Sequence, residues 1–592
     1  MFRRIHRVFT HVLRYLQRRL NEKQFLIFSS ILVGVSSGLA AVILKLFAHN
    51  INAIVAKYSG NYEDFFLFTL FPLVGLTITV LYIRYFIKKE EFSKGSADIV
   101  YAIAKKSSVL PKSQIYSHVI SSAFTVGFGG SVGLESPMVS SGSAIGSNYG
   151  KTYHLSYKDR TMLLACGAAA AIAGAFNSPI AGVLFAIEVL LTDVSVSVFI
   201  PLIISAASGA LFSKIILGEG VLLSFSGVQP FDYNNTPFYI LLGILAGLTS
   251  LYYTRMFTNI EHRISSVSNT YAKVIGGGLT LAVLLILFPP LYGEGYEGIK
   301  ELALSNHHSL FQNSILQSFI TTEWAGLVFL IGLMLIKVFA TAITIGSGGN
   351  GGNFAPSLCV GAYLGYTFSH FINVTGWAKI PQANFTLVAM AGILSGVFYA
   401  PLTAIFLIAE ITGGYNLMIP LMIVAAFSNI IMKYFEPLSM ENKKLANKMN
   451  LSVENRDKYL LSKLNLENMI ETDFQAVKPD DNLRSLVSAI TKSRRNLFPV
   501  VNDEQELVGV ILLDSVKEMM FNQDLYDKIV VKDIMTRPLA VISPDESLNS
   551  VLKKFEDTGQ WNLPIIENYR YIGFLSKSSI LSEYRVELLR SS

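Results

Sequence analysis

The chain has 592 residues, of which 51% are hydrophobic and 15% are charged, and its formal net charge is +6. Soluble domains carry about 25% charged residues, so this composition excludes an ordinary water-soluble globule for most of the chain. We find no nucleophile paired with a base, no metal-ligand spacing and no phosphate-binding loop. We therefore expect no enzymatic activity, no catalytic residue, no metal and no cofactor.

Residues 1–22 are basic and predict a cytosolic amphipathic helix. Seven Lys and Arg residues lie between positions 3 and 23, and the first acidic residue is Glu22. By the positive-inside rule this places the N-terminus in the cytosol. We interpret residues 4–20 as a helix on the membrane surface and not as a cleavable signal peptide. The positive charge therefore reflects topology, and we expect no nucleic-acid partner.

Long stretches that are nearly free of charge follow and predict a bundle of membrane helices, because a bilayer core takes about 20 apolar residues per helix. The clearest are Phe25–Phe47, Phe65–Tyr82, Val274–Tyr292, Trp324–Ile345, Phe385–Ile408 and Leu417–Met432. The two cysteines, Cys166 and Cys359, both lie in apolar segments. We expect them to be packing residues and not a disulfide or a metal site.

The membrane part contains an internal repeat. Gly129–Pro137 aligns without a gap on Gly348–Pro356, an offset of 219 residues, and glycines follow at the same two distances in both copies. A second pair, Gly174–Glu188 and Gly396–Glu410, repeats a proline that is followed nine residues later by a glutamate. Two related halves are implied, and halves of this kind are usually inverted, with a substrate site near the bilayer midplane.

The repeated glycine-proline segments predict loops that lead into helices. The first amides of such a helix have no intrahelical partner, and together with the helix dipole they attract small anions. Close helix packing is the alternative role for these glycines. Glu135 is a carboxylate at one of these helix ends, within apolar sequence. Ionised, it would take the place of an anion, and protonated or displaced it would free that place.

Beyond residue 447 the hydrophobicity falls and the sequence becomes soluble α/β in character. A pattern that starts at Leu497 and continues to Asp514 recurs from Leu563 to Ser576. This indicates two copies of one small unit that pack as a pair.

These segments together resemble the CLC family of chloride channels and chloride/proton exchangers, followed by paired CBS domains. Gly95-Ser96 is similar to the family's Gly-Ser-Gly-Ile-Pro, Gly133–Pro137 to Gly-Lys/Arg-Glu-Gly-Pro, and Gly352–Pro356 to Gly-x-Phe-x-Pro. The resemblance covers nearly the whole chain. It implies an all-α polytopic membrane protein with two inverted repeats of tilted and broken helices, plus a C-terminal α/β CBS pair. It also implies a homodimer in the lipid membrane in which each subunit has its own chloride pore.

The resulting division of the chain has five parts. They are the N-terminal helix at 1–22, the transmembrane domain at 23–447 with halves at about 23–215 and 235–447, a linker at 448–465, and CBS domains at 466–525 and 526–592.

The resemblance also implies roles for individual residues. Ser96 would offer its hydroxyl to the central anion, and the amides at Asn353, Phe354 and Ala355 would face the same ion. The amides from Leu134 to Ser136 would line the outer site, and Glu135 would be the gating glutamate. A serine at position 96 favours chloride over nitrate.

Several positions depart from the family pattern. Val189 stands where proton-coupled relatives have a second glutamate, which favours uncoupled conduction. We interpret the neighbouring Glu188 as structural because Glu410 repeats it. The inner gate, usually a tyrosine, falls on Glu441 or on Ser439, depending on the anchor of the alignment. Leu134 and Ser136 replace a basic residue and a glycine in the outer motif.

The tail also departs from its pattern. CBS domains often bind adenine nucleotides through a threonine and an aspartate, but Ser515 and Ser579 occupy the aspartate positions and Leu512 and Ser576 the threonine positions. This favours a structural or dimer-stabilising role over nucleotide binding.

We therefore expect a passive, glutamate-gated chloride channel in a prokaryotic inner membrane, with both termini in the cytosol. A chloride/proton exchanger whose proton path uses water or Glu441 is the nearest alternative. A membrane sensor or scaffold that signals through the CBS tail is the alternative from another class.

Overall fold

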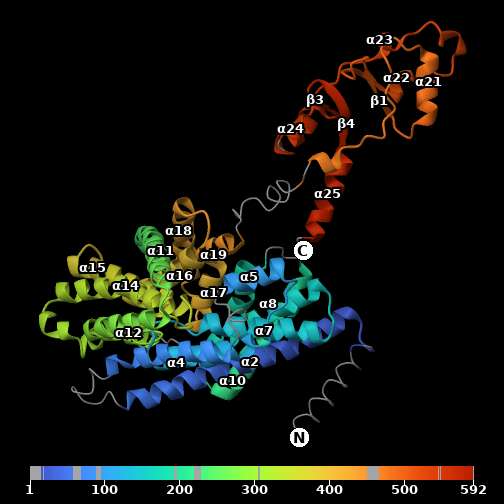
Figure 1. The fold of residues 1–592 in the computed structure, drawn as a ribbon. Coiled ribbons are helices and arrows are strands. Elements are labelled where there is room, and N and C mark those ends of the chain that lie inside the picture. Colours follow the sequence, from blue (N-terminus) through green and yellow to red (C-terminus); the bar gives the residue numbers. More distant parts are fainter. Residues whose placement is uncertain are drawn as a thin grey trace. The chain divides into compact units, whose positions relative to one another are not determined.

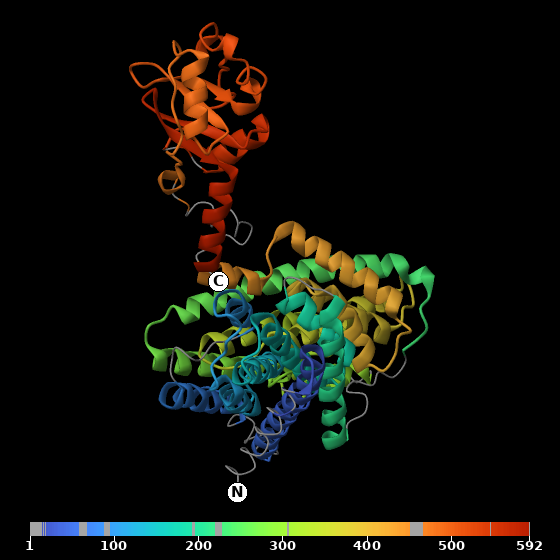
Figure 2. The same ribbon diagram turned by 90° about the vertical axis from the view of Figure 1, so that its right-hand side faces the viewer.

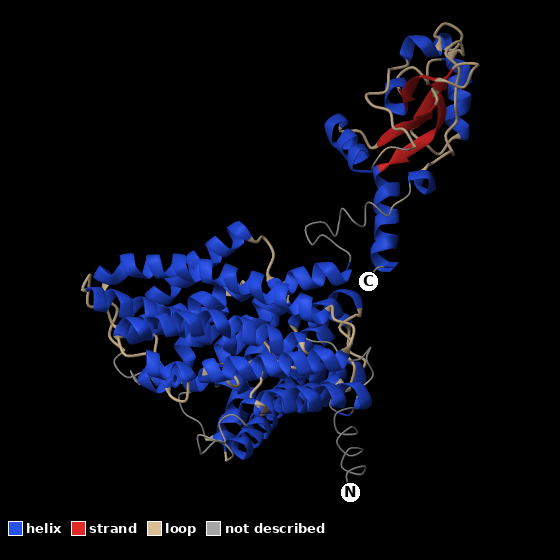
Figure 3. Cartoon of the chain, turned by 60° about the vertical axis from the view of Figure 1, so that its left-hand side comes forward, coloured by secondary structure: helices blue, strands red, loops and turns tan. Residues whose placement is uncertain are grey.

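The computed structural model describes residues 19–57, 68–87, 95–191, 196–218, 228–304, 307–449, 466–544 and 548–590, with four single positions beside them. Most of the predicted helix at 4–20 and of the predicted linker at 448–465 lies outside the described residues. The chain forms two compact units, which we call the membrane unit, Met1–Leu445, and the tail unit, Ala446–Ser592. Figure 3 shows helices throughout the first, whereas the strands of the described residues all lie in the second.

The membrane unit is a bundle of helices (Figures 1 and 2), and seven of those described are long and apolar enough to cross a bilayer. The helices of the first half are α2 (Glu22–Ala56), α4 (Phe71–Phe86), α5 (Ser96–Lys105), α6 (Gln114–Gly127), α7 (Glu135–Thr152), α8 (Tyr157–Phe176), α9 (Pro179–Phe185), η1 (Ala186–Leu190) and α10 (Val196–Leu217). Those of the second half are η2 (Tyr233–Asn235), α11 (Thr236–Ser265), α12 (Thr270–Leu287), η3 (Pro289–Leu291), α13 (Tyr296–Ala303), η4 (His307–Phe311), η5 (Ile315–Phe319), α14 (Glu323–Gly346), α15 (Phe354–Thr375), α16 (Gln382–Phe398), α17 (Pro401–Ile411), α18 (Met418–Phe435) and α19 (Met440–Met449).

The two halves have the same packing scheme. Helix α2 packs on α8 and α10 as α11 packs on α16 and α18, and α5 packs on α7 as α13 packs on α15. In Figure 1 the first-half helices α5, α7 and α8 lie on one side of the unit and α12, α14 and α15 on the other. The halves meet where Gly133 and Gly352 pair antiparallel, with N–H to O=C distances of 2.9 and 2.8 Å. These two glycines are 219 residues apart, which is the offset of the sequence repeat.

The stretch Phe385–Ile408, which reads as one apolar segment, is two helices, and this corrects the simplest reading of its hydropathy. Helix α16 ends before Tyr399, which has a left-handed backbone with φ of 59°, and α17 begins at Pro401. Asn177, with φ of 55°, separates α8 from α9 in the same way. A left-handed residue ends a helix, and a proline at the next helix start leaves no intrahelical donor.

Glycines that follow the two repeated motifs bring helices together. A Cβ added to Gly142 on α7 would lie 2.3 Å from the carbonyl oxygen of Gly167 on α8. A Cβ on Gly365 of α15 would lie 2.2 Å from the carbonyl oxygen of Phe385 on α16. Close packing is therefore the role of these glycines.

The repeated glutamates cap each other's helices. Glu188 accepts hydrogen bonds from the amides of Leu402 and Thr403 at the start of α17, at 3.1 and 2.8 Å. Glu410 accepts from the amides of Ile180 and Ala181 at the start of α9, at 3.1 and 2.9 Å. A carboxylate at a helix N-terminus satisfies free amides and opposes the helix dipole. Both glutamates thus have structural roles.

The tail unit contains two copies of one motif, as the sequence repeat predicts. Each has a helix and an antiparallel hairpin whose first strand also pairs in parallel with a single upstream residue. The helices and strands are η7 (Leu466–Met469), α21 (Leu483–Lys492), β1 (Leu497–Val501), β2 (Leu507–Leu512), α22 (Leu513–Val516), η8 (Gln523–Leu525), α23 (Val531–Ile534), α24 (Leu548–Thr558), β3 (Asn562–Glu567), β4 (Arg570–Ser576) and α25 (Lys577–Arg590). A shared cluster of Phe474, Leu497 and Phe574 joins the copies.

Candidate functional site

The N-termini of α7 and α15 meet at the paired loops of the two halves. The first printed intrahelical bonds run from Met138 N–H to the Leu134 carbonyl, at 3.0 Å, and from Ser357 N–H to the Asn353 carbonyl, at 2.9 Å. The amides of the residues just before these donors therefore precede the first turn of each helix. Two helix dipoles direct their positive ends to one region in this arrangement.

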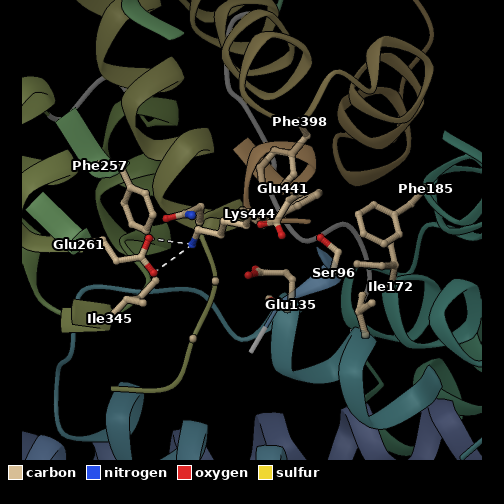
Figure 4. A pocket seen from close by; sticks show the side chains of 17 residues that line it. Ser96, Glu135, Ile172, Phe185, Phe257, Glu261, Ile345, Phe398, Glu441 and Lys444 are labelled. Atoms are coloured by element: carbon tan, nitrogen blue, oxygen red, sulfur yellow. Dashed lines mark hydrogen bonds and ion pairs between the residues drawn. The ribbon is translucent and has the colours of Figure 1, made fainter. Parts of the chain in front are cut away.

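A cavity of about 210 Å³ lies at this meeting point and has room for a small ion with several waters. Figure 4 shows Ser96, Glu135 and Glu441 around one space, with Lys444 and Glu261 beside it. The lining consists of Gly95, Ser96, Glu135, Ser136, Val139, Ile172, Phe185, Phe257, Glu261, Ile345, Gly351, Gly352, Asn353, Phe354, Phe398, Glu441 and Lys444. It thus joins residues from α5, α7 and α15, which are far apart in the sequence.

Glu135, the predicted gating residue, is the first residue of α7 and is only 3% exposed. Its Oε1 accepts a hydrogen bond from the hydroxyl of Tyr296 at 2.7 Å. Its Oε2 lies over Gly133, where a Cβ would come within 2.1 Å of that oxygen. The glycine therefore makes room for the carboxylate at the helix end. A hydroxyl from α13, which the sequence did not single out, holds it there.

Glu441, one of the two residues predicted for the inner gate, lines the cavity. Its Oε2 accepts a hydrogen bond from the Ala97 amide at 3.0 Å, in the first turn of α5. Ser439 is not among the lining residues, and its hydroxyl accepts a hydrogen bond from the Asn442 amide at the start of α19. The structure thus places the carboxylate, and not the serine, at the cavity.

Ser96 and Phe354 form the opposite wall of the cavity. Ser96 is 8% exposed and follows Gly95, whose φ of 88° requires glycine. The Phe354 ring packs against Phe176 and Phe398, with centroids 5.5 and 5.4 Å apart. A polar hydroxyl and peptide amides among aromatic rings match the pattern of a site that holds a small anion without a full cation.

Two predicted anion ligands do not lie open to the cavity. The Leu134 amide donates to Oε1 of Glu294 at 3.1 Å, so a carboxylate already occupies it. Ala355 is fully buried and is not a lining residue. Glu294 and Tyr296 come from a connection 159 to 161 residues after Glu135. No local sequence pattern indicated that they would approach it.

Three carboxylates and one ammonium line the cavity, namely Glu135, Glu261, Glu441 and Lys444. Lys444 pairs with Glu261 at 2.7 Å and lies 5.3 Å from the centre of the Phe257 ring. The pair leaves Glu135 and Glu441 to set the charge of the cavity. Ionised, they would repel an anion, so anion entry requires that they be neutral or displaced.

Val189, at the position of the second glutamate in proton-coupled relatives, lies in the π-helical turn η1. It is half-buried and packs against the main hydrophobic core. It has no group that titrates. In the tail unit, Ser576 and Ser579 form a reciprocal cap at the start of α25, with bonds of 2.9 and 3.3 Å. Ser515 is exposed, in α22.

A sequence model described as "Voltage gated chloride channel" matches residues 74–433. The chain belongs to this family. The family resemblance seen in the glycine-rich motifs is thereby confirmed, and so is the CBS pair, because the model described as "CBS domain" matches residues 466–521 and 531–586. The chain is therefore an integral membrane protein of a family of anion-transport proteins.

Relatives in this family are named both as channels and as exchangers. A ClcB-like chloride channel protein of Ralstonia nicotianae is 29% identical over 362 residues, which cover 60% of this chain and 80% of that protein. The chloride channel protein CLC-f of Arabidopsis thaliana is 25% identical over 545 residues, covering 80% and 68%. An H⁺/Cl⁻ exchange transporter ClcA of Vibrio cholerae is 28% identical over 316 residues, covering 51% and 62%.

Solved structures of the voltage gated chloride channel family share the fold. A slow cyanobacterial Cl⁻/H⁺ antiporter superposes with a TM-score of 0.61 at 19% identity, covering 74% of this chain and all of that one. A eukaryotic CLC transporter superposes with a TM-score of 0.60 at 18% identity, covering 94% and 97%. The predicted fold class, with inverted repeats of broken helices and a CBS tail, is confirmed.

Proposed function

We propose that the protein conducts chloride across the membrane through the cavity, as a passive channel gated by Glu135. The observation that carries the proposal is the convergence of Ser96 and the helix starts at Glu135 and Phe354 on one enclosed space. In this proposal Ser96 and the amides at Ser136, Asn353, Phe354 and Ala355 hold the ion, and Leu134 does so when its amide is free. Glu135 competes with the ion for the same place.

The passive mechanism is supported by Val189, which has no proton to relay. A second candidate function, chloride/proton exchange, is favoured by Glu441, a carboxylate that lines the cavity and bonds the Ala97 amide. In that mechanism Glu441 would carry the proton that Val189 does not.

Simultaneous recording of chloride and proton movement from liposomes that contain the purified protein tests these functions. A chloride gradient should move chloride and drive no uphill proton movement in a passive channel. Proton pumping in a fixed ratio to chloride would establish exchange instead. Negligible chloride flux would contradict both functions and favour a sensor or scaffold that acts through the tail.

We further propose that the protein is a homodimer in a prokaryotic inner membrane, with both termini in the cytosol, and that it is not an enzyme. The basic N-terminal segment supports this orientation. Cross-linking in native membranes tests the dimer, and accessibility of terminal tags tests the orientation.

A further inference from the structure

A second carboxylate, Glu294, lies at the head of α7 beside Glu135. It belongs to the turn between η3 and α13, and its Oε1 accepts the Leu134 amide at 3.1 Å. That amide is one of those that the proposed function gives to the permeant anion. Neither Glu294 nor Tyr296 is a lining residue of the cavity, so both approach Glu135 from another side.

The turn that carries Glu294 is held by a buried lysine. Lys337 is fully buried on α14, and its Nζ donates to the Ser131 hydroxyl at 2.8 Å and to the Gly293 carbonyl at 3.1 Å. The next residue of the turn, Gly295, has φ of 94°, and a Cβ there would lie 3.2 Å from that Nζ. Lys337 therefore ties the turn to the loop that precedes α7, and the glycine allows this close approach.

The charged and titratable groups that face Glu294 come from five helices. They are Lys45 on α2, Glu135 on α7, Tyr296 on α13, Lys337 on α14 and Cys359 on α15. Two carboxylates at one helix end disfavour being ionised together, because the same positive dipole faces both. Protonation of the pair is therefore coupled, and so is its competition with an anion.

The plainest role for Glu294 is a helix cap, and that role needs only an acceptor oxygen. The position of the carboxylate argues for more. It lies on an amide of the proposed ion path, next to the proposed gate, with a buried ammonium close by. A cap without further function would not need a charge at this place.

We propose that Glu294 is a second gating carboxylate, which occupies the Leu134 amide when ionised and releases it to a permeant anion when protonated. The inference rests on the proposed function, because it assigns a role in the same chloride path. It makes two carboxylates, and not one, responsible for the pH dependence of transport.

Chloride flux from liposomes, with chloride and pH varied on each side in turn, tests the inference with Glu294→Gln. The glutamine keeps an acceptor for the Leu134 amide but has no charge. We expect the chloride concentration for half-maximal flux to fall about tenfold on one side, the ratio that one charged hydrogen-bonding competitor represents. The matched control is Glu297→Gln, an exposed glutamate on α13 that pairs with Lys300.

Two comparisons keep the inference separate from the proposed function. Absence of chloride flux in the wild-type protein would overturn both. Normal wild-type flux with Glu294→Gln indistinguishable from Glu297→Gln would overturn the inference alone. If Glu294→Gln does not fold, the Glu135→Gln variant decides instead. It should keep a residual pH dependence from Glu294, and flux independent of pH in that variant would contradict the inference.

Discussion

The hydroxyl of Tyr296 donates a hydrogen bond of 2.7 Å to Oε1 of Glu135 and so joins α13 to the head of α7. This bond holds the carboxylate at the helix end that the proposed function assigns to chloride. The relationship defines the closed state of the path, because the carboxylate and an anion compete for the same positive end of α7.

Glu135→Gln should raise chloride flux at neutral pH and remove most of its pH dependence. Glutamine can still accept the Tyr296 bond but mimics the protonated gate. If one protonation opens the wild-type path, its flux rises by up to about tenfold per unit fall in pH until saturation. Flux from liposomes between acidic and neutral pH measures this. A variant with the full wild-type pH dependence would exclude gating by Glu135.

Glu441→Gln should raise chloride flux at neutral pH by about tenfold, because one ionised competitor for the Ala97 amide is lost. Ser439→Ala is the matched control, since that serine caps α19 and does not line the cavity. Equal flux in both variants would mean that Glu441 does not limit the path. If the wild-type protein proves to be an exchanger, Glu441→Gln should also abolish its proton movement.

Ser96→Pro should raise the ratio of nitrate to chloride flux by roughly 2-fold to 10-fold, the range expected for the loss of one hydrogen bond to chloride. Ser96→Ala removes the hydroxyl without the proline ring and should shift the ratio in the same direction. Flux ratios from liposomes loaded with either anion measure the effect. An unchanged ratio would show that selectivity arises at another position.

Glu188→Ala and Glu410→Ala should each lower the free energy of unfolding by about 2 kcal/mol, because each removes a carboxylate that accepts two amides at a helix start. The effects should be similar, since the glutamates hold equivalent places in the two halves. Thermal unfolding in detergent measures them against Glu297→Ala. A large loss in only one variant would contradict this equivalence.

The tail unit should lose stability in acid. The Arg484 guanidinium bonds Asp527 and lowers the pKa of that carboxyl below its usual range. A lowered folded-state pKa contributes stability above the unfolded pKa, and that stability is lost as the pH falls below about 3.9. Asp527→Asn should therefore lose less stability than the wild type between about pH 5 and pH 3.

Trp561 fluorescence reports on the tail within the full chain, once Trp324 and Trp377 of the membrane unit are changed to phenylalanine. Lys577 lies 5.4 Å from the centre of the Trp561 ring, so unfolding should alter the emission. Identical acid profiles for the wild type and Asp527→Asn would show that this pair does not set the acid sensitivity.

The sequence alone determined the membrane class, the two-half architecture and the paired tail motif. Composition decides which solvent a chain can tolerate, and a repeat with a constant offset requires two similarly folded halves. The pairing of Gly133 with Gly352 is the direct result of that offset. Glu135 could also be singled out, because a lone carboxylate at a glycine-led helix start is visible in the local pattern.

Only the tertiary structure decided what surrounds that carboxylate. Tyr296 and Glu294 reach α7 from another half of the unit, and the choice of Glu441 over Ser439 depends on which side of α19 faces the cavity. These contacts join residues more than 150 positions apart. Local periodicity and motif spacing contain no information about such contacts, because they arise from the packing of whole helices against one another.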